Sequence, residues 1–74
     1  MQIQVSCYAT LARFTPQDGT LEVEQGSTAR DLIRYLQVPE DDVKIIFING
    51  KSSDPDNPLN DQDRVGIFPA VGGG

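Results

Sequence analysis

Residues 1–7 place apolar side chains at every odd position and polar side chains at positions 2, 4 and 6. Side chains of a β-strand alternate between the two faces of a sheet, so this period predicts a strand with one buried face. Residues 15–19 form a Pro- and Gly-containing turn segment, and residues 20–24 alternate again, with Leu21 and Val23 on one side. The two alternating segments are expected to pair as a hairpin with one face in water.

Residues 29–36 change to a helical period. Apolar residues recur there at spacings of three and four, which predicts one buried stripe made of Ala29, Leu32, Ile33 and Leu36. Thr28 or the residue before it can cap this helix, and Thr28 with Asp31 resembles a capping box in which Asp takes the usual place of Glu. Pro39 disfavours helical geometry at Val38, so the helix is expected to end there.

Residues 43–48 are a run of β-branched and aromatic side chains around one lysine, which predicts a strand. Asn49 and Gly50 follow directly, and this pair favours a tight type I′ turn. Residues 51–63 contain two Pro, two Asn and four Asp. This composition predicts an irregular loop with Leu59 as its apolar anchor, and the acidic positions lack the Gly and the closing Glu of a calcium-binding loop.

Residues 64–68 are the last predicted strand, with Val65 and Ile67 on one face. The order is therefore strand, strand, helix, strand, loop, strand. A single amphipathic helix must bury its stripe against the apolar face of one sheet. The prediction is an α+β fold of the β-grasp type, with one mixed sheet of four to five strands packed on one main helix. The expected domain covers residues 1–68, and residues 69–74 are expected to be a flexible C-terminal tail.

Composition excludes several classes of function. The net charge of −5 disfavours nucleic-acid binding and suits a partner with a basic docking surface. The single cysteine, Cys7, cannot form an internal disulfide, and its place in the inward set of the first strand predicts a buried thiol rather than a nucleophile. The chain has no histidine, and neither a bound metal nor a bound cofactor is expected. No apolar run approaches the roughly 18 residues of a membrane span, and no signal region is visible, so a cytoplasmic protein is expected.

Two arginines and two tyrosines are expected to have structural rather than functional roles. Arg30 and Arg34 are expected to be solvated charges on the helix. Tyr8 and Tyr35 are interpreted as side chains that close the ends of the core.

Five segments, taken in order, resemble motifs of the ubiquitin-like sulfur carriers (the MoaD and ThiS proteins). They are Ala9-Thr10-Leu11-Ala12-Arg13, Gly26-Ser27-Thr28-Ala29-Arg30-Asp31-Leu32, Asn49-Gly50, Leu59-Asn60-Asp61-Gln62-Asp63-Arg64-Val65 and Phe68-Pro69-Ala70-Val71-Gly72-Gly73-Gly74. The last segment is closer to MoaD, the small subunit of molybdopterin synthase, because the thiamine-pathway carrier ThiS does not usually have the Phe-Pro pair. One departure is Gly72, where the family more often has Ala.

The resemblance implies a protein that is not an enzyme but a co-substrate and small subunit. A ubiquitin-activating-type adenylyltransferase (MoeB/ThiF-like) would use ATP to join Gly74 to AMP, and a sulfur donor would then replace AMP to leave a thiocarboxylate. A molybdopterin synthase large subunit (MoaE-like) would accept this sulfur in molybdenum or tungsten cofactor biosynthesis. Gly72 and Gly73 lack side chains, so they would let a thin arm enter a partner's channel.

A docking surface is expected on the open face of the sheet. If alternate residues of the 43–48 strand face the helix from Val43 onward, the open face carries an apolar patch that continues into the tail. Its expected members are Ile46, Ile48, Phe68, Pro69 and Val71. A bulge that turns Phe68 inward, or a loop that covers Ile48, would remove this patch.

Four alternatives remain open from the sequence, and one of them, a β-grasp RNA-binding domain, is disfavoured by the acidic charge. The chain could be a ubiquitin-like modifier that forms isopeptide bonds with lysines, or a thiamine-type sulfur carrier. It could also be a non-covalent β-grasp binding subunit, for which a blocked C-terminus would make no difference.

Overall fold

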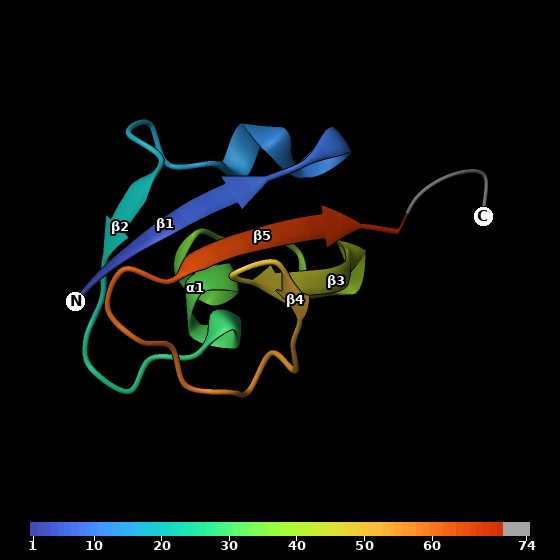
Figure 1. The fold of residues 1–74 in the computed structure, drawn as a ribbon. Coiled ribbons are helices and arrows are strands. Elements are labelled where there is room, and N and C mark those ends of the chain that lie inside the picture. The colour runs from blue at the N-terminus through green and yellow to red at the C-terminus, as the bar shows by residue number, and fades with distance from the viewer. Residues whose placement is uncertain (71–74) are drawn as a thin grey trace.

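The computed structural model describes residues 1–70, which form a sheet layer with a helix packed on one face (Figure 1). The elements are β1 (Gln2–Cys7), the 3₁₀ helix η1 (Ala9–Phe14), β2 (Thr20–Glu22), α1 (Ala29–Tyr35), the 3₁₀ helix η2 (Glu40–Asp42), β3 (Val43–Ile48), β4 (Lys51–Ser52) and β5 (Arg64–Pro69). This architecture confirms the predicted β-grasp fold. Within the described residues, no helix is long and apolar enough to cross a membrane.

The sheet is mixed, and its strand order is β2-β1-β5-β3-β4. β1 and β5 pair in parallel at the centre, with Val5 opposite Val65, while β5 and β3 pair antiparallel. β1 and β2 form the predicted hairpin, with Ile3 opposite Leu21. The segments that begin and end the domain therefore lie side by side, although nearly the whole chain separates them in sequence (Figure 1).

The core lies between the sheet and α1. The inward residues of β1 and β5 are almost completely buried, as are Ala29, Leu32 and Ile33 of the predicted helix stripe, whereas Leu36 follows the helix and is partly buried. Leu59 is 3% exposed and anchors the long loop. Leu11 of η1 also belongs to the core, which the sequence did not indicate because a 3₁₀ helix of six residues is too short to show a repeating hydrophobic period. Each buried Leu or Ile contributes about 1.5–3 kcal/mol relative to an exposed position.

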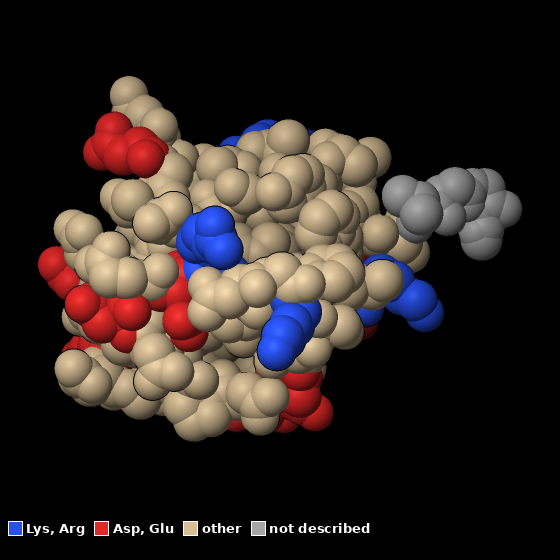
Figure 2. Space-filling model, viewed as in Figure 1, with Lys and Arg blue, Asp and Glu red and all other residues tan. Residues whose placement is uncertain are grey.

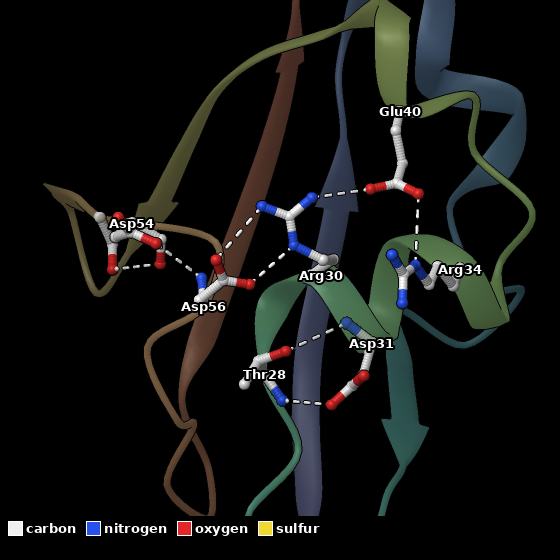
Figure 3. A network of polar contacts seen from close by, with 8 residues as sticks. Thr28, Arg30, Asp31, Arg34, Glu40, Asp54 and Asp56 are labelled. Atoms are coloured by element: carbon white, nitrogen blue, oxygen red, sulfur yellow. Dashed lines mark hydrogen bonds and ion pairs between the residues drawn. The ribbon is translucent and has the colours of Figure 1, made fainter.

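The start of α1 is the predicted capping box. The Asp31 backbone N–H donates to Thr28 Oγ1 at 3.2 Å, and the Thr28 N–H donates to Asp31 Oδ2 at 2.9 Å. Both orphan donors are thereby satisfied (Figure 3).

The other end of α1 is closed by a different device from the one predicted. The helix ends at Tyr35, before Pro39 can act, because Gln37 adopts a left-handed conformation with φ of 62°. The Val38 N–H then donates back to the Ile33 carbonyl at 2.9 Å, as in a Schellman motif.

The Asn49-Gly50 turn has the predicted conformation. Both residues have positive φ, 53° and 84°, which is the geometry of a type I′ turn between β3 and β4. Asn49 also connects this turn to β5, since its Oδ1 accepts from the Arg64 N–H at 3.0 Å and its Nδ2 donates to Asp63 Oδ1 at 2.9 Å.

The predicted orientation of β3 is wrong from Ile45 onward. The pairing between β3 and β5 shifts between Val43 and Ile45, so one extra residue changes the phase of the alternation. Ile46 is 5% exposed and Ile48 packs against the core, whereas Ile45 is 40% exposed. Ile46 and Ile48 are therefore not members of an open-face patch.

Pro69 is also placed differently from the prediction. It is the last residue of β5, pairs with Val43 and is buried, so the strand extends one residue beyond the expected boundary at residue 68. A proline fits here because β5 is at its end and needs no further N–H at this position. Val71 and the three terminal glycines lie outside the described residues.

Candidate functional site

An aromatic cluster of Tyr8, Phe47 and Phe68 lies on the open face of the sheet. The Tyr8 and Phe68 rings are stacked, with centroids 4.3 Å apart and planes 6° from parallel. Phe47 meets Phe68 edge-on at 5.3 Å and 81°. Such pairs contribute about 0.5–1.5 kcal/mol each beyond the area that they bury. Phe68 is on the open face as predicted, while Tyr8 does not close the core and Phe47 replaces the isoleucines that were expected.

Ile45 extends this cluster toward the end of β5. It is opposite Phe68 in the register of β3 and β5, and with Tyr8, 44% exposed, it is one of the most exposed large apolar residues among those described. An exposed apolar group of this kind on a small domain indicates a contact surface. The alternation of β1 could have identified Tyr8, because it continues the outward set of positions 2, 4 and 6.

Gly66 allows the aromatic rings to lie across β5. A Cβ atom at this position would be 3.2 Å from Phe68 Cε1 and 3.4 Å from Tyr8 Cε2. Contacts this short would push at least one ring away from its present place. A glycine inside a predicted strand often marks a close approach, so the sequence contained this signal even though residue 66 was not singled out.

The aromatic cluster lies where the C-terminal segment leaves the sheet. β1 and β5 are parallel and end at the same edge, where the Tyr8 N–H donates to the Ile67 carbonyl at 3.0 Å. Pro69 is held against Val43, and Ala70 is the last described residue (Figure 1). Whatever follows Ala70 therefore begins beside an exposed apolar surface. The predicted reactive residues Gly72, Gly73 and Gly74 follow there, outside the described part.

A polar region adjoins the aromatic cluster on the same face. A shallow depression is lined by the three aromatic residues together with Gln4, Ser6 and Arg64, among others. Gln4 is opposite Arg64, and Ser6 is opposite Gly66, in the parallel pairing of β1 with β5. The depression thus has an apolar end near the chain exit and a polar end where Arg64 is its one charged residue.

Charges on the helix side are paired within the chain. Arg30 Nε lies 2.7 Å from Asp56 Oδ1 and Arg30 Nη1 lies 2.9 Å from Glu40 Oε1, while Arg34 Nε lies 3.2 Å from Glu40 Oε2 (Figure 3). Both arginine side chains remain accessible to solvent, as expected, and the ion pairs are an addition that the sequence did not indicate. Hydrogen bonds from Arg34 and then Arg30 lower the pKa of Glu40, and the hydrogen bond from Arg30 lowers the pKa of Asp56.

Cys7 takes no part in either surface. Its side chain is in the core and 6% exposed, as predicted, and burial raises the pKa of its thiol. A thiol held in its neutral form is a poor nucleophile. Among residues 1–70, no three side chains of the metal-binding types come together.

The ThiS family model matches residues 5–74 of the chain. The chain belongs to the ThiS family. Its members are ubiquitin-like sulfur carriers, a class that includes the MoaD proteins, so the resemblance found in the sequence is confirmed. No curated protein matches this ThiS-family chain by sequence.

Solved structures with the same fold include three informative neighbours of this ThiS-family protein. A Pyrococcus furiosus protein described as molybdopterin converting factor, subunit 1, is 28% identical over 96% of this chain and 99% of its own, with a TM-score of 0.76. Small archaeal modifier protein 1 from Haloferax volcanii is 17% identical over 95% and 98%, with a TM-score of 0.73. A complex of subunits 1 and 2 of the molybdopterin-converting factor from Helicobacter pylori contains a chain that is 21% identical over 100% of both, with a TM-score of 0.61.

Proposed function

We propose that this protein carries sulfur as a thiocarboxylate on Gly74 and donates it in molybdopterin biosynthesis. The observation that carries the proposal is the family match through residue 74, on a chain whose last strand is fixed between two others up to Pro69. The 28% identity with a molybdopterin converting factor subunit 1 favours this pathway over the thiamine pathway.

The proposed chemistry requires activation of a carboxylate, which is a poor acyl donor. An oxygen of the Gly74 carboxylate attacks the α-phosphate of ATP on an adenylyltransferase of the MoeB/ThiF type, and pyrophosphate leaves. A hydrosulfide-type donor then attacks the acyl carbon of the adenylate, and AMP leaves with the bonding electron pair. The product is a thiocarboxylate, and the carrier itself supplies position and reach while the partner supplies the catalytic groups.

The geometry of the described residues supports a two-part interaction in this proposal. The aromatic cluster and Ile45 would dock on the partner, and the segment after Ala70 would enter the partner's active site. Four residues span at most about 14 Å when fully extended. The reacting carbon would therefore have to lie within this distance of the docked face.

The acceptor of sulfur in this proposal is a large subunit of the MoaE type. The Helicobacter pylori structure is a complex of subunits 1 and 2, which supports a partner of this kind for a chain with the same fold. The adenylyltransferase and the large subunit would both need the arm, so they would bind the carrier one after the other and not together.

Intact-mass measurement tests the proposed chemistry. The purified protein is incubated with its cognate adenylyltransferase, ATP and sulfide, and its mass should rise by the difference between one sulfur and one oxygen atom. Deleting Gly74 should abolish the shift and leave the thermal unfolding curve unchanged. A variant with one alanine added after Gly74 is the matched control and should also remain unmodified. The proposal would be ruled out if the wild-type protein stayed unmodified while the same preparation of enzyme activated a carrier that is already established as its substrate.

The same reaction mixtures separate the proposal from the modifier alternative. Addition of a cell lysate would produce lysine-linked adducts of the carrier if amines are the natural acceptors. Transfer of the sulfur to a precursor of molybdopterin in the presence of the large subunit would support the proposed pathway.

A further inference from the structure

We propose that the open face of the sheet recognises its partner through a carboxylate that pairs with Arg64, next to an apolar contact with the aromatic cluster. The proposal rests on the function proposed above and specifies the chemistry of the partner's surface. It differs from the expectation drawn from net charge, because a chain with a charge of −5 suggests a basic partner surface.

The acidic residues of this chain are not on the part of the surface that would dock. Within residues 1–70, none of the residues that line the depression is Asp or Glu, and Arg64 is its one charged member. Figure 2 shows this face, where acidic side chains gather at the left margin and underneath while the area over β1 and the end of β5 is mostly uncharged. The negative net charge therefore comes from residues outside the depression.

Arg64 is held on the open face by the register of β5. Val65, Ile67 and Pro69 are buried, so the residues between them alternate to the other side of the sheet. Arg64 is exposed, and within the described residues its guanidinium has no ion pair, whereas Arg30 and Arg34 both do. A guanidinium presents a planar set of donors that fits a carboxylate with two parallel hydrogen bonds.

The sheet also fixes the spacing of the two contacts. Arg64 and Phe68 are four residues apart on one strand and face the same side, which places them about 13 Å apart along β5. Gln4 and Ser6 lie beside this line and offer neutral hydrogen-bonding groups. The partner surface should therefore present an apolar side chain near the chain exit and a carboxylate about 13 Å from it.

A protein carboxylate fits this arrangement better than a free phosphate group. The depression is shallow and shared with aromatic rings, so it offers a single cation and no ring of donors around an anion. The long-range field of a chain with a charge of −5 also repels polyanions. A single carboxylate in an apolar protein surface needs one cation, can contact the aromatic rings through its apolar surroundings, and is not a polyanion.

Equilibrium binding to the cognate adenylyltransferase, measured by calorimetry without ATP, tests the proposal. Arg64→Glu should weaken binding by about tenfold or more at low salt, because it replaces an attraction with a repulsion. The loss should shrink as salt rises. Arg13→Glu is the matched control, since it makes the same change of charge on η1, away from the depression, and its binding should equal that of the wild type.

A charge exchange identifies the partner group. Replacing acidic residues of the adenylyltransferase by arginine, one at a time, should restore binding of the Arg64→Glu carrier at one position and weaken binding of the wild type there. Equal affinities of Arg64→Glu and Arg13→Glu would overturn the inference while leaving the sulfur-carrier proposal intact. Failure of the wild type to acquire sulfur despite binding would overturn that proposal, and the affinities would still decide the role of Arg64. A third outcome would also overturn the carboxylate contact. If millimolar inorganic phosphate abolishes binding of the wild-type carrier, and no charge exchange restores binding of Arg64→Glu, the anion that Arg64 binds is phosphate.

Discussion

The helix side and the open face of this protein use arginine in opposite ways. On the helix side, Arg30 is bonded to two carboxylates that come from the loop before β5 and from η2. On the open face, Arg64 stands next to neutral and aromatic groups of the same chain. The difference shows that the neighbours within the chain decide the role of an arginine. An arginine with carboxylates beside it holds the fold together, and one without them remains available to a partner. Net charge, which averages both faces, does not make this distinction.

The helix-side contacts organise a long loop that has little secondary structure of its own. The Arg30 N–H donates to the Pro55 carbonyl at 2.9 Å, and the Leu59 N–H donates to the Ser27 carbonyl at 2.8 Å. The ion pair of Arg30 with Asp56 adds a third attachment in the same place (Figure 3). These charges are exposed, so their main effect is to select the position of the loop rather than to raise stability greatly.

The largest effect should appear where the two faces meet in β3. Ile46→Ala removes a buried side chain and should lower the free energy of unfolding by about 2–4 kcal/mol in urea titrations. Ile45→Ala, its neighbour on the open face, should leave stability almost unchanged and weaken partner binding. Equal losses of stability in the two variants would contradict the bulge between Val43 and Ile45.

Substitution of the two exposed tyrosines, one on each face, tests whether the aromatic cluster is the docking site. Tyr8→Ala removes the ring stacked on Phe68 and should weaken binding to the adenylyltransferase by at least about fivefold, since aromatic residues at the centre of an interface often contribute more than 1 kcal/mol. Tyr35→Ala removes a ring that is 69% exposed on the helix and should bind like the wild type. Similar binding constants for both variants would mean that the aromatic cluster is not at the interface.

Gly66→Ala should produce a smaller change confined to the open face. The added methyl group would displace the ring of Phe68 or Tyr8, so we expect a stability loss of about 1 kcal/mol from strain on that packing. Near-ultraviolet circular dichroism should report the displaced tyrosine. Gly19 has open space around it but positive φ, so a substitution there would test backbone strain instead and should leave the aromatic signal unaltered.

The smallest effect should come from the helix-side ion pairs, and it should depend on pH. The folded-state pKa values of Glu40 and Asp56 are lowered, so their contribution is present above the unfolded values near 4 and is lost as pH falls through the folded values. Arg30→Gln should therefore be slightly less stable than the wild type at pH 7, and the two melting curves should converge at low pH. A difference that grows with acid would reverse the sign of this linkage.

Short-range sequence patterns predicted much of the fold and the place of Phe68 in the candidate site. The alternation of β1, the stripe and capping box of α1 and the turn at Asn49-Gly50 all depend on neighbours within a few residues, and each was found as predicted. Phe68 was placed correctly for the same reason. The orientation of Ile46 was not, because one inserted residue inverts every later side chain and no local signal marks it.

Contacts between segments that are distant in the sequence could not be predicted either. Arg30 and Asp56 are 26 residues apart, and nothing in either segment specifies that they meet. The sequence predicts Pro69 as part of the tail because residues 69–74 have no strand signal, whereas pairing with Val43 keeps it in the sheet. The depression beside Arg64 likewise exists only after β5 has joined β1 and β3.

The central position of β5 has a consequence for when the protein becomes complete. Among the strands that the structure describes, the β1–β2 pair and the β3–β4 pair are not neighbours in the sheet, and residues 64–69 join them. Until this strand is synthesised, a growing polypeptide has no sheet hydrogen bonds between the two strand pairs, and an isolated two-stranded hairpin is at best marginally stable in water. Because the same strand leads directly into the residues proposed to react, immature chains would have no assembled surface with which to engage an activating enzyme.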